Sequence, residues 1–306
     1  MILMSRALLF FIVIVSLCSC EVEAVSDINI AEKDPYYCLI SSSVDIDSYF
    51  SYNPNQYDVI VSGHRGGRLQ GYPENCIETF EQILKYIPVF FEIDIRETKD
   101  GIAVLLHDDT LDRTTTGEGN LCDYTFEEIQ QLYLVDSKGQ KTNYRIPSLT
   151  DVIKWSQNKV ILNFDNKTIS TEDLCKIVDN CGAKNCIFTI MSPVMAKEIL
   201  KYIPDARFSA YISSKEKLYR YRSEGLLSKI VVAYLESYEV TDEDLLDAIH
   251  QEGIRCMVAT ATMGGNSDIS RINFLNSVLS TRPDIIETDY PCLMTFFNSI
   301  RVPSRL

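Results

Sequence analysis

The stretch VFFEIDI, residues 89–95, decides the fold because it is apolar apart from two carboxylates. Alternate side chains of a strand point to opposite faces, so Glu92 and Asp94 share one face. A strand that is buried on both faces is typical of a parallel sheet covered by helices. Two carboxylates inside such a sheet cost several kcal/mol unless they are paired or bind a cation. Ion pairs with Arg96 and Lys99, or exposure at a sheet edge, are the alternatives to a metal site.

Around this stretch the chain alternates short apolar runs with segments of helical period. The apolar runs are rich in β-branched residues, which favour strands. Eight such strands are predicted, at residues 59–62, 89–95, 159–164, 186–190, 207–211, 230–234, 255–259 and 284–287. Each is followed by a predicted helix, at residues 75–86, 149–156, 171–180, 193–202, 215–223, 241–250, 269–280 and 293–299.

Eight strand–helix units predict an α/β fold, a closed (β/α)8 TIM barrel. A doubly wound open sheet is the alternative, since periodicity alone does not exclude it. A small insertion at about residues 101–148 follows the second strand, with a short strand at 102–106 and a helix near 126–133. We expect this insertion on the face of the barrel where such enzymes carry their active sites.

The charge of the chain limits its ligands. The 306 residues carry a formal net charge of -14, which repels nucleic acid. The same charge repels an anionic phosphodiester, so a phosphate site would need local positive charge from basic residues or a metal. We expect a small-molecule substrate and no nucleic-acid or protein partner.

The N-terminus has the features of an export signal. Arg6 precedes an apolar run at residues 7–17, too short to span a membrane comfortably. The following Leu-Cys-Ser-Cys, residues 17–20, resembles the lipobox of bacterial lipoproteins, in which Cys20 would carry the lipid. Cleavage of a plain secretory signal is the alternative. We therefore expect an exported protein, held on a membrane by lipid or else secreted or periplasmic, with a signal at 1–20, a tether and leading segment at 21–57 and a catalytic domain at 58–306.

Eight cysteines lie beyond this signal, and export would permit disulfides. Cys175, Cys181 and Cys186 are close in sequence, but their spacing is not that of a CxxC metal site. Buried thiols that act as small hydrophobic groups are therefore expected.

The chain contains three histidines. His64 follows the first strand and His107 follows the extra strand, and strand exits are where barrel enzymes place catalytic groups. His250 ends a helix, so we expect it to face solvent and favour the helix dipole. Asp165 and Lys167 share a face at the end of the third strand. They could complete a metal site and contact a phosphate, or form a simple salt bridge.

Several short motifs follow one another in a fixed order. They are HRG at 64–66, PEN at 73–75, ExD at 92–94, DG at 100–101, HD at 107–108 and LDRTT at 111–115. This order strongly resembles the N-terminal half of the glycerophosphodiester phosphodiesterase family. The resemblance continues more weakly to DxK at 165–167 and to DIIETDYP at 284–291.

The resemblance implies a barrel that hydrolyses glycerophosphodiesters to glycerol phosphate and an alcohol. It implies that His64 and His107 act as acid and base. It also implies that Glu92, Asp94 and Asp165 bind one divalent cation, Ca²⁺ or Mg²⁺.

Further residues take roles from the same resemblance. Arg65 and Lys167 would contact phosphate oxygens, and Glu74 would contact the glycerol or orient His64. Residues 112–116, which include Arg113, are expected instead to anchor the insertion.

The chain also departs from the family pattern. Asp165 stands where the family usually has glutamate, so a water could bridge it to the cation. The seventh strand reads Met-Val-Ala-Thr at 257–260 where the family often has Trp-Thr, which leaves the alcohol group undetermined. Two rivals remain: a phospholipase D- or C-like diesterase on the same barrel, and an inactive surface binding protein.

Overall fold

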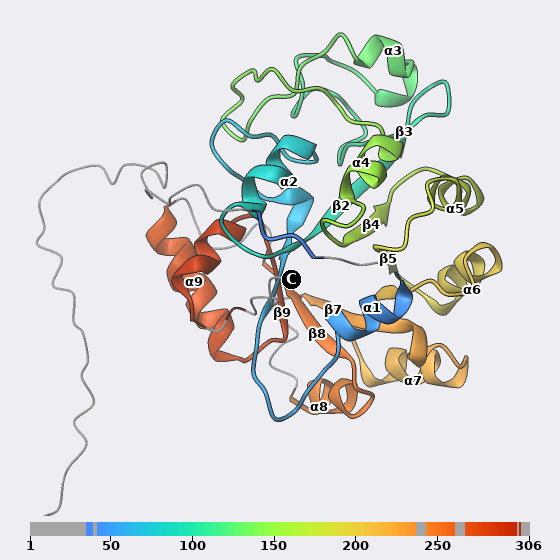
Figure 1. Ribbon diagram of the computed structural model, residues 1–306, viewed down its shortest axis with the longest axis vertical. Helices are drawn as coiled ribbons and strands as arrows, with labels where there is room; N and C mark the ends of the chain where they lie inside the picture. Colours follow the sequence, from blue (N-terminus) through green and yellow to red (C-terminus); the bar gives the residue numbers. More distant parts are fainter. Residues whose placement is uncertain (1–34, 39–41, 237–242, 261–266, 299, 301–306) are drawn as a thin grey trace, which may run out of the picture.

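The computed structural model describes residues 35–38, 42–236, 243–260, 267–298 and 300. The proposed signal at 1–20, with Cys20, lies outside the described residues. Eight parallel strands form a barrel that helices surround (Figure 1). The strands are β1 (Ile60–Gly63), β2 (Phe90–Glu97), β4 (Leu162–Asn166), β5 (Cys186–Ile190), β6 (Phe208–Tyr211), β7 (Ile230–Glu236), β8 (Arg255–Ala259) and β9 (Ile285–Thr288).

The barrel is closed by β1. This strand pairs in parallel with β2, where Ser62 lies opposite Phe90, and with β9, where Ser62 lies opposite Glu287. An open doubly wound sheet has two unpaired edges, so this pairing excludes it. The predicted TIM barrel is confirmed.

The outer helices follow their strands in order. Several begin at a serine cap; Ser148 and Ser170, for example, accept hydrogen bonds from the backbone amides of Asp151 and Asp173. The helices are α2 (Ile77–Leu84), α4 (Leu149–Ser156), α5 (Thr171–Asn180), α6 (Pro193–Tyr202), α7 (Lys215–Ser223), α8 (Glu243–Gln251) and α9 (Asp268–Ser280).

Two predicted elements differ from the structure. The segment expected as a helix at 293–299 is a 3₁₀ helix, η6 (Pro291–Phe296), which begins at a proline. The strand expected at 159–164 begins later, at Leu162, because the amides of Lys159 and Val160 still bond the Ser156 carbonyl at the end of α4. The shift places Asp165 within β4 itself.

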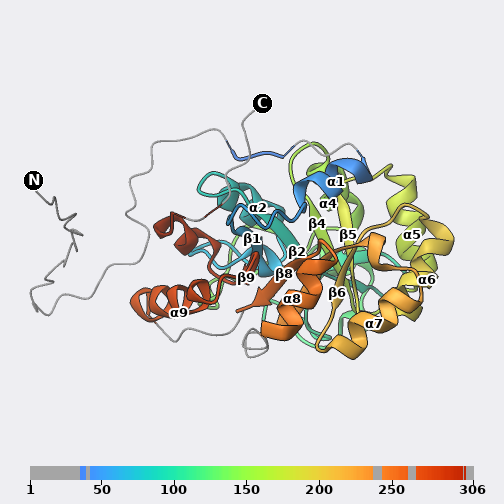
Figure 2. The same cartoon turned by 90° about the horizontal axis from the view of Figure 1, so that it is seen from below.

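The end of the barrel at which the parallel strands begin, its lower end, is filled by a short leading helix, α1 (Ser43–Tyr49). Ile46 and Phe50 are buried against residues that begin the strands, and the Phe50 ring meets Phe90 edge-on at 5.3 Å. Asp47 pairs with Arg207 at the start of β6, with a 2.6 Å contact between Oδ2 and Nη2. The chain therefore enters at the amino-terminal end of the barrel (Figure 2).

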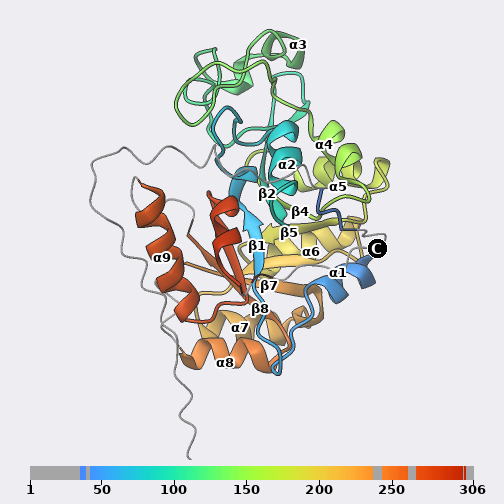
Figure 3. The same cartoon turned by 60° about the vertical axis from the view of Figure 1, so that its left-hand side comes forward.

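The segment between β2 and α4 forms a separate layer above the barrel rim (Figure 3). β3 (Ala103–Leu105) pairs antiparallel with β2, and η3 (Leu121–Asp123) and α3 (Phe126–Ile129) follow. The segment has a small core that it completes with Cys76 from the start of α2. Its own buried residues there are Val104, Leu106, Leu111, Leu121, Ile129, Leu134 and Ile146. It is thus a packed unit rather than an extended loop.

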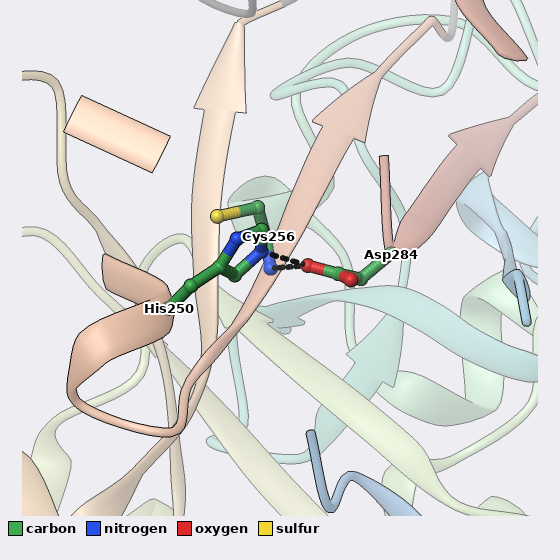
Figure 4. A group of neighbouring side chains, drawn as sticks. All are labelled: His250, Cys256 and Asp284. Atoms are coloured by element: carbon green, nitrogen blue, oxygen red, sulfur yellow. Dashed lines mark hydrogen bonds and ion pairs between the residues drawn. The ribbon is translucent and has the colours of Figure 1, made fainter. Parts of the chain in front are cut away.

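The expectation that His250 faces solvent is wrong. Its Nε2 lies 2.7 Å from Asp284 Oδ2, and this oxygen also accepts the Cys256 amide at 2.8 Å (Figure 4). The imidazole stacks on Tyr52, with ring centroids 4.3 Å apart. His250, Cys256 and Asp284 are close enough to hold a metal ion. The imidazole nitrogen and the carboxylate oxygen that would bind it are, however, already hydrogen-bonded to each other. We therefore interpret this group as a link between α8 and the lower end of the barrel.

Cys175 and Cys186 are buried as expected, whereas Cys181 is only partly buried. Cys76, Cys256 and Cys292 are buried as well. Burial raises the pKa of the Cys175 thiol to about 11. Among the described residues, no helix is both long and apolar enough to cross a membrane.

Candidate active site

The site begins at the turn that follows β1. His64–Gly66 forms a 3₁₀ turn in which Arg65 has a positive φ of 54°. A Cβ on Gly66 would overlap the Phe80 ring, and one on Gly67 would lie 2.7 Å from Pro291. The two glycines therefore let the turn pack against α2 and η6. This packing directs the Arg65 amide at Glu92 Oε2, 2.9 Å away.

Three acidic side chains converge beside this turn. Asp94 on β2 lies opposite Asp165 on β4, and Glu92 precedes them on the same face. One carboxylate oxygen from each lies within 4.8 Å of the others, which is a suitable cluster for a metal ion. Burial, and then the charges of Asp94, Glu287 and Asp165, raise the pKa of Glu92 well above its usual value.

Basic and amide groups balance part of this charge. Lys167 Nζ lies 3.1 Å from Asp94 Oδ1 and 2.6 Å from Asp165 Oδ2. Asn75 donates from Nδ2 to Asp94 Oδ2 at 2.8 Å. Burial alone would lower the pKa of Lys167, but the two aspartates outweigh it and the pKa is raised. The lysine therefore stays charged beside the acidic cluster.

Glu287 on β9 is a further buried carboxylate near this cluster, and the sequence did not single it out as a site residue. It accepts a hydrogen bond from Ser62 Oγ at 3.0 Å. Burial raises its pKa, and the charges of Asp165 and Asp94 raise it further, against the lowering effects of His64 and Ser62. Glu287 and Asp289 are two residues apart, the same spacing as Glu92 and Asp94, and this spacing was the available signal.

His64 is held by Asp289. Its Nδ1 lies 2.6 Å from Asp289 Oδ1, and Arg68 Nε lies 2.9 Å from the other oxygen of that carboxylate. The expectation that Glu74 orients His64 is therefore wrong. Glu74 instead pairs with Arg65, at 3.3 Å between Oε1 and Nη1.

His107 is held by its neighbour in the sequence. Its Nδ1 lies 2.7 Å from Asp108 Oδ1, and its carbonyl accepts Arg96 Nε at 2.7 Å. Arg113 grips Asp108 through two hydrogen bonds of 2.7 and 2.9 Å. This arginine, followed by the contribution of His107, lowers the pKa of Asp108 against the effect of burial.

Arg113 does more than anchor the insertion, contrary to expectation. It also makes two 2.8 Å hydrogen bonds to Glu74, one to each carboxylate oxygen. A continuous path of contacts thus runs from Arg65, beside His64, through Glu74 and Arg113 to Asp108 and His107. His107 belongs to this path through Asp108, whereas the His64 side chain contacts Asp289 and adjoins the path only through its chain neighbour Arg65.

Comparisons with known proteins place the chain in a family. The sequence profile of the Glycerophosphoryl diester phosphodiesterase family matches residues 64–277, more than half of the chain. This chain belongs to that family. The family is one of phosphoric diester hydrolases.

One solved relative covers most of the chain. The crystal structure of a glycerophosphoryl diester phosphodiesterase from Parabacteroides distasonis is 35% identical, with a TM-score of 0.81. The match covers 86% of this chain and 93% of that one. The likeness therefore extends over the whole barrel.

Curated relatives match over a shorter stretch. A glycerophosphodiester phosphodiesterase from Caldanaerobacter subterraneus is 39% identical over 104 residues, which are 34% of this chain and 42% of that protein. Glycerophosphodiester phosphodiesterase 1 of Rattus norvegicus is 40% identical over 98 residues, 31% of this chain and 29% of that protein. The matched stretch thus spans less than half the length of either relative.

The buried charge of Glu92 leads to a prediction about stability. A carboxylate whose pKa is raised by folding destabilises the protein above its usual pKa, so Glu92→Gln should stabilise the cation-free protein at neutral pH. We expect a higher midpoint of urea unfolding with EDTA present. The gain should shrink as the pH falls toward the ordinary carboxyl range.

Glu127→Gln, on the exposed surface of α3, is the matched control and should change stability little. Loss of stability in Glu92→Gln under these conditions would contradict the prediction, because it would mean that the carboxylate is already satisfied without a cation.

Proposed function

We propose that this chain hydrolyses glycerophosphodiesters to glycerol phosphate and an alcohol. The observation that carries the proposal is a pair of imidazoles, each bound through Nδ1 to a carboxylate, on the same rim as a largely buried acidic cluster. In both histidines the carboxylate fixes the ring and leaves Nε2 for proton transfer. Membership of the family supports the same reaction.

We infer that Glu92, Asp94 and Asp165 hold one divalent cation, Ca²⁺ or Mg²⁺. Their oxygens are the ligands that such hard cations prefer, and the raised pKa of Glu92 indicates negative charge that the protein alone does not neutralise. One oxygen of Asp165 lies within 4.8 Å of the ligand oxygens of Glu92 and Asp94, which supports a place for this shorter carboxylate in the cluster. When bound, the cation would offset charge on the phosphoryl group.

The remaining steps belong to side chains of this protein. Arg65 and Lys167 bind the phosphate oxygens; the guanidinium can make two parallel contacts and the ammonium provides a point charge. One of His64 and His107 takes a proton at Nε2 from the attacking oxygen, of water or of a substrate hydroxyl, as that oxygen bonds to phosphorus. The other gives a proton to the alcohol oxygen as its bond to phosphorus breaks. Attack by a substrate hydroxyl forms a cyclic phosphate, which water then opens to glycerol phosphate. Glu74 is placed by Arg65 and Arg113 at the edge of the same site, where it can contact substrate.

The rival functions make different demands on the site. A phospholipase D- or C-like diesterase would use similar histidines, but the family profile favours the glycerophosphodiesterase. An inactive binding protein would need no proton transfer and would have no reason to fix both imidazoles. Measuring whether the protein hydrolyses a glycerophosphodiester distinguishes the enzyme from the binding protein.

Release of glycerol phosphate from glycerophosphocholine tests the reaction. We expect activity that EDTA abolishes and Ca²⁺ or Mg²⁺ restores. His64→Ala and His107→Ala should each lose at least a hundredfold in kcat, the usual scale for an acid–base group.

The control is His250→Gln, which changes the third histidine at the far end of the barrel and should keep full activity. If hydrolysis persists with EDTA present in His64→Ala, the mechanism is wrong. Tight binding of a diester without turnover would support the binding protein.

Arg113 gives a second test, because it joins Glu74 to Asp108. Arg113→Lys keeps the charge but cannot make four hydrogen bonds to two carboxylates, so Asp108 should hold His107 less firmly. We expect kcat to fall about tenfold to a hundredfold, as for loss of a residue that orients a functional ligand.

Arg220→Lys is the matched change on the exposed face of α7, where Arg220 pairs with Glu216, and should leave kcat unchanged. Equal kcat values for Arg113→Lys and the parent enzyme would remove Arg113 from the mechanism.

We also propose that the protein is exported and carries lipid on Cys20. The Leu-Cys-Ser-Cys stretch at 17–20 supports this proposal. In a bacterial host, the parent protein should incorporate labelled palmitate and enter the detergent phase, whereas Cys20→Ser should do neither. Cys122→Ser, at an exposed position, is the control. Absence of label from the parent protein would favour a plain secretory signal.

A further inference from the structure

A cavity of about 330 Å³ lies between the β1–α2 loop and the segment that follows β3. Arg68 and Glu74 line it from the loop, and Arg113, Thr114 and Ser137 line it from the segment. The volume is at the lower end of the range for small-molecule sites. It is therefore large enough for part of a substrate but not for a macromolecular segment.

The walls of this cavity connect to both histidines. Arg68 pairs with Asp289, the carboxylate that holds His64. Arg113 pairs with Asp108, the carboxylate that holds His107. A group bound in the cavity would thus lie beside both halves of the proposed catalytic machinery.

Thr114 is the feature of the cavity that calls for a ligand. The residue is 5% exposed, and its hydroxyl has no hydrogen-bond partner among the described residues. A buried polar group left without a partner destabilises a protein. A hydroxyl group of a ligand would supply the missing partner, since it can both donate and accept.

The charges that line the cavity are already balanced. Glu74 is bound by Arg65 and Arg113. Asp136 accepts hydrogen bonds from three backbone amides, those of Gly71, Lys138 and Gln140, at 2.9–3.1 Å. Neither carboxylate is left to attract a cationic head group. The two arginines of the lining, Arg68 and Arg113, are likewise paired with carboxylates and are not left to attract an anion.

An aromatic cage for a quaternary ammonium group would be another way to bind a cation. Tyr72 lines the cavity, but its ring stacks on Tyr144, with centroids 6.0 Å apart. The lining is therefore suited to an uncharged ligand that offers several hydroxyl groups.

We propose that this cavity binds the uncharged polyol part of a glycerophosphodiester and that Thr114 makes a hydrogen bond to one of its hydroxyls. The inference rests on the proposed function. A polyol can come from two sources: the glycerol half that these substrates share, or a hydroxylated alcohol on the other side of the phosphate. The experiment distinguishes them.

The test compares kcat/KM for three diesters in the full-length parent enzyme and in Thr114→Val. Glycerophosphoglycerol has a polyol on both sides of the phosphate, glycerophosphocholine on one side, and bis(p-nitrophenyl) phosphate on neither. Valine keeps the shape of threonine and removes the hydroxyl. Thr116→Val is the control, because the hydroxyl of Thr116 accepts the Tyr133 amide outside the cavity.

In Thr114→Val we expect kcat/KM for the affected glycerophosphodiester to fall about tenfold more than kcat/KM for bis(p-nitrophenyl) phosphate. A ratio of about tenfold corresponds to one lost hydrogen bond. A drop for both glycerophosphodiesters assigns the cavity to the glycerol half, and a drop for glycerophosphoglycerol alone assigns it to the alcohol. Thr116→Val should leave the ratios as they are. Ser137→Ala, a second wall residue, should lower the same ratio if Thr114→Val folds poorly.

Two results would overturn the inference on its own: unchanged ratios in both wall variants, or an equal loss for all three diesters. In either case the parent enzyme still hydrolyses diesters, so the proposed function stands. A parent enzyme that releases product from none of the three, with Ca²⁺ or Mg²⁺ present, overturns the proposed function and the inference together.

Discussion

The concentration of negative charge at the mouth of the barrel is the constraint on which the rest of the site depends. Glu92, Asp94 and Glu287 are buried, and Asp165 lies beside them. Carboxylates inside a packed barrel are tolerated only with compensating charge or hydrogen bonds. Lys167 and the backbone amide of Arg65 supply part of this compensation. The sharp turn after β1 and the tight glycine packing beneath it serve to bring that amide to Glu92.

Carboxylates with compensating partners also surround each histidine. Asp289 and Asp108 each bind an imidazole on one side and an arginine on the other. One of these arginines follows the barrel's first strand, and the other, Arg113, comes from the segment above the rim. The segment therefore has a direct part in the site, because it contains His107, the carboxylate of Asp108 that binds it, and the arginine that binds this carboxylate.

Local patterns predicted the fold and the first set of site residues. The run at 89–95 is apolar on one face and acidic on the other, and both properties can be read from neighbouring residues. The partners of the histidines could be predicted less well. Asp108 is adjacent to His107, but Asp289 is far from His64 in sequence, and their contact exists only because the barrel closes through β1 and β9. His250 was misjudged for a similar reason, since Tyr52 and Asp284 reach it from other elements.

The two ends of the barrel differ, because the leading segment closes the lower end. The described chain first bonds the barrel at that end, where the Tyr36 amide meets the Leu84 carbonyl, and Phe50 then seals the interior. His64 follows β1, so it lies at the opposite end, where the strands finish. The leading helix and the candidate site thus occupy opposite ends of the barrel, so loss of the plug should weaken the core without removing any group of the site.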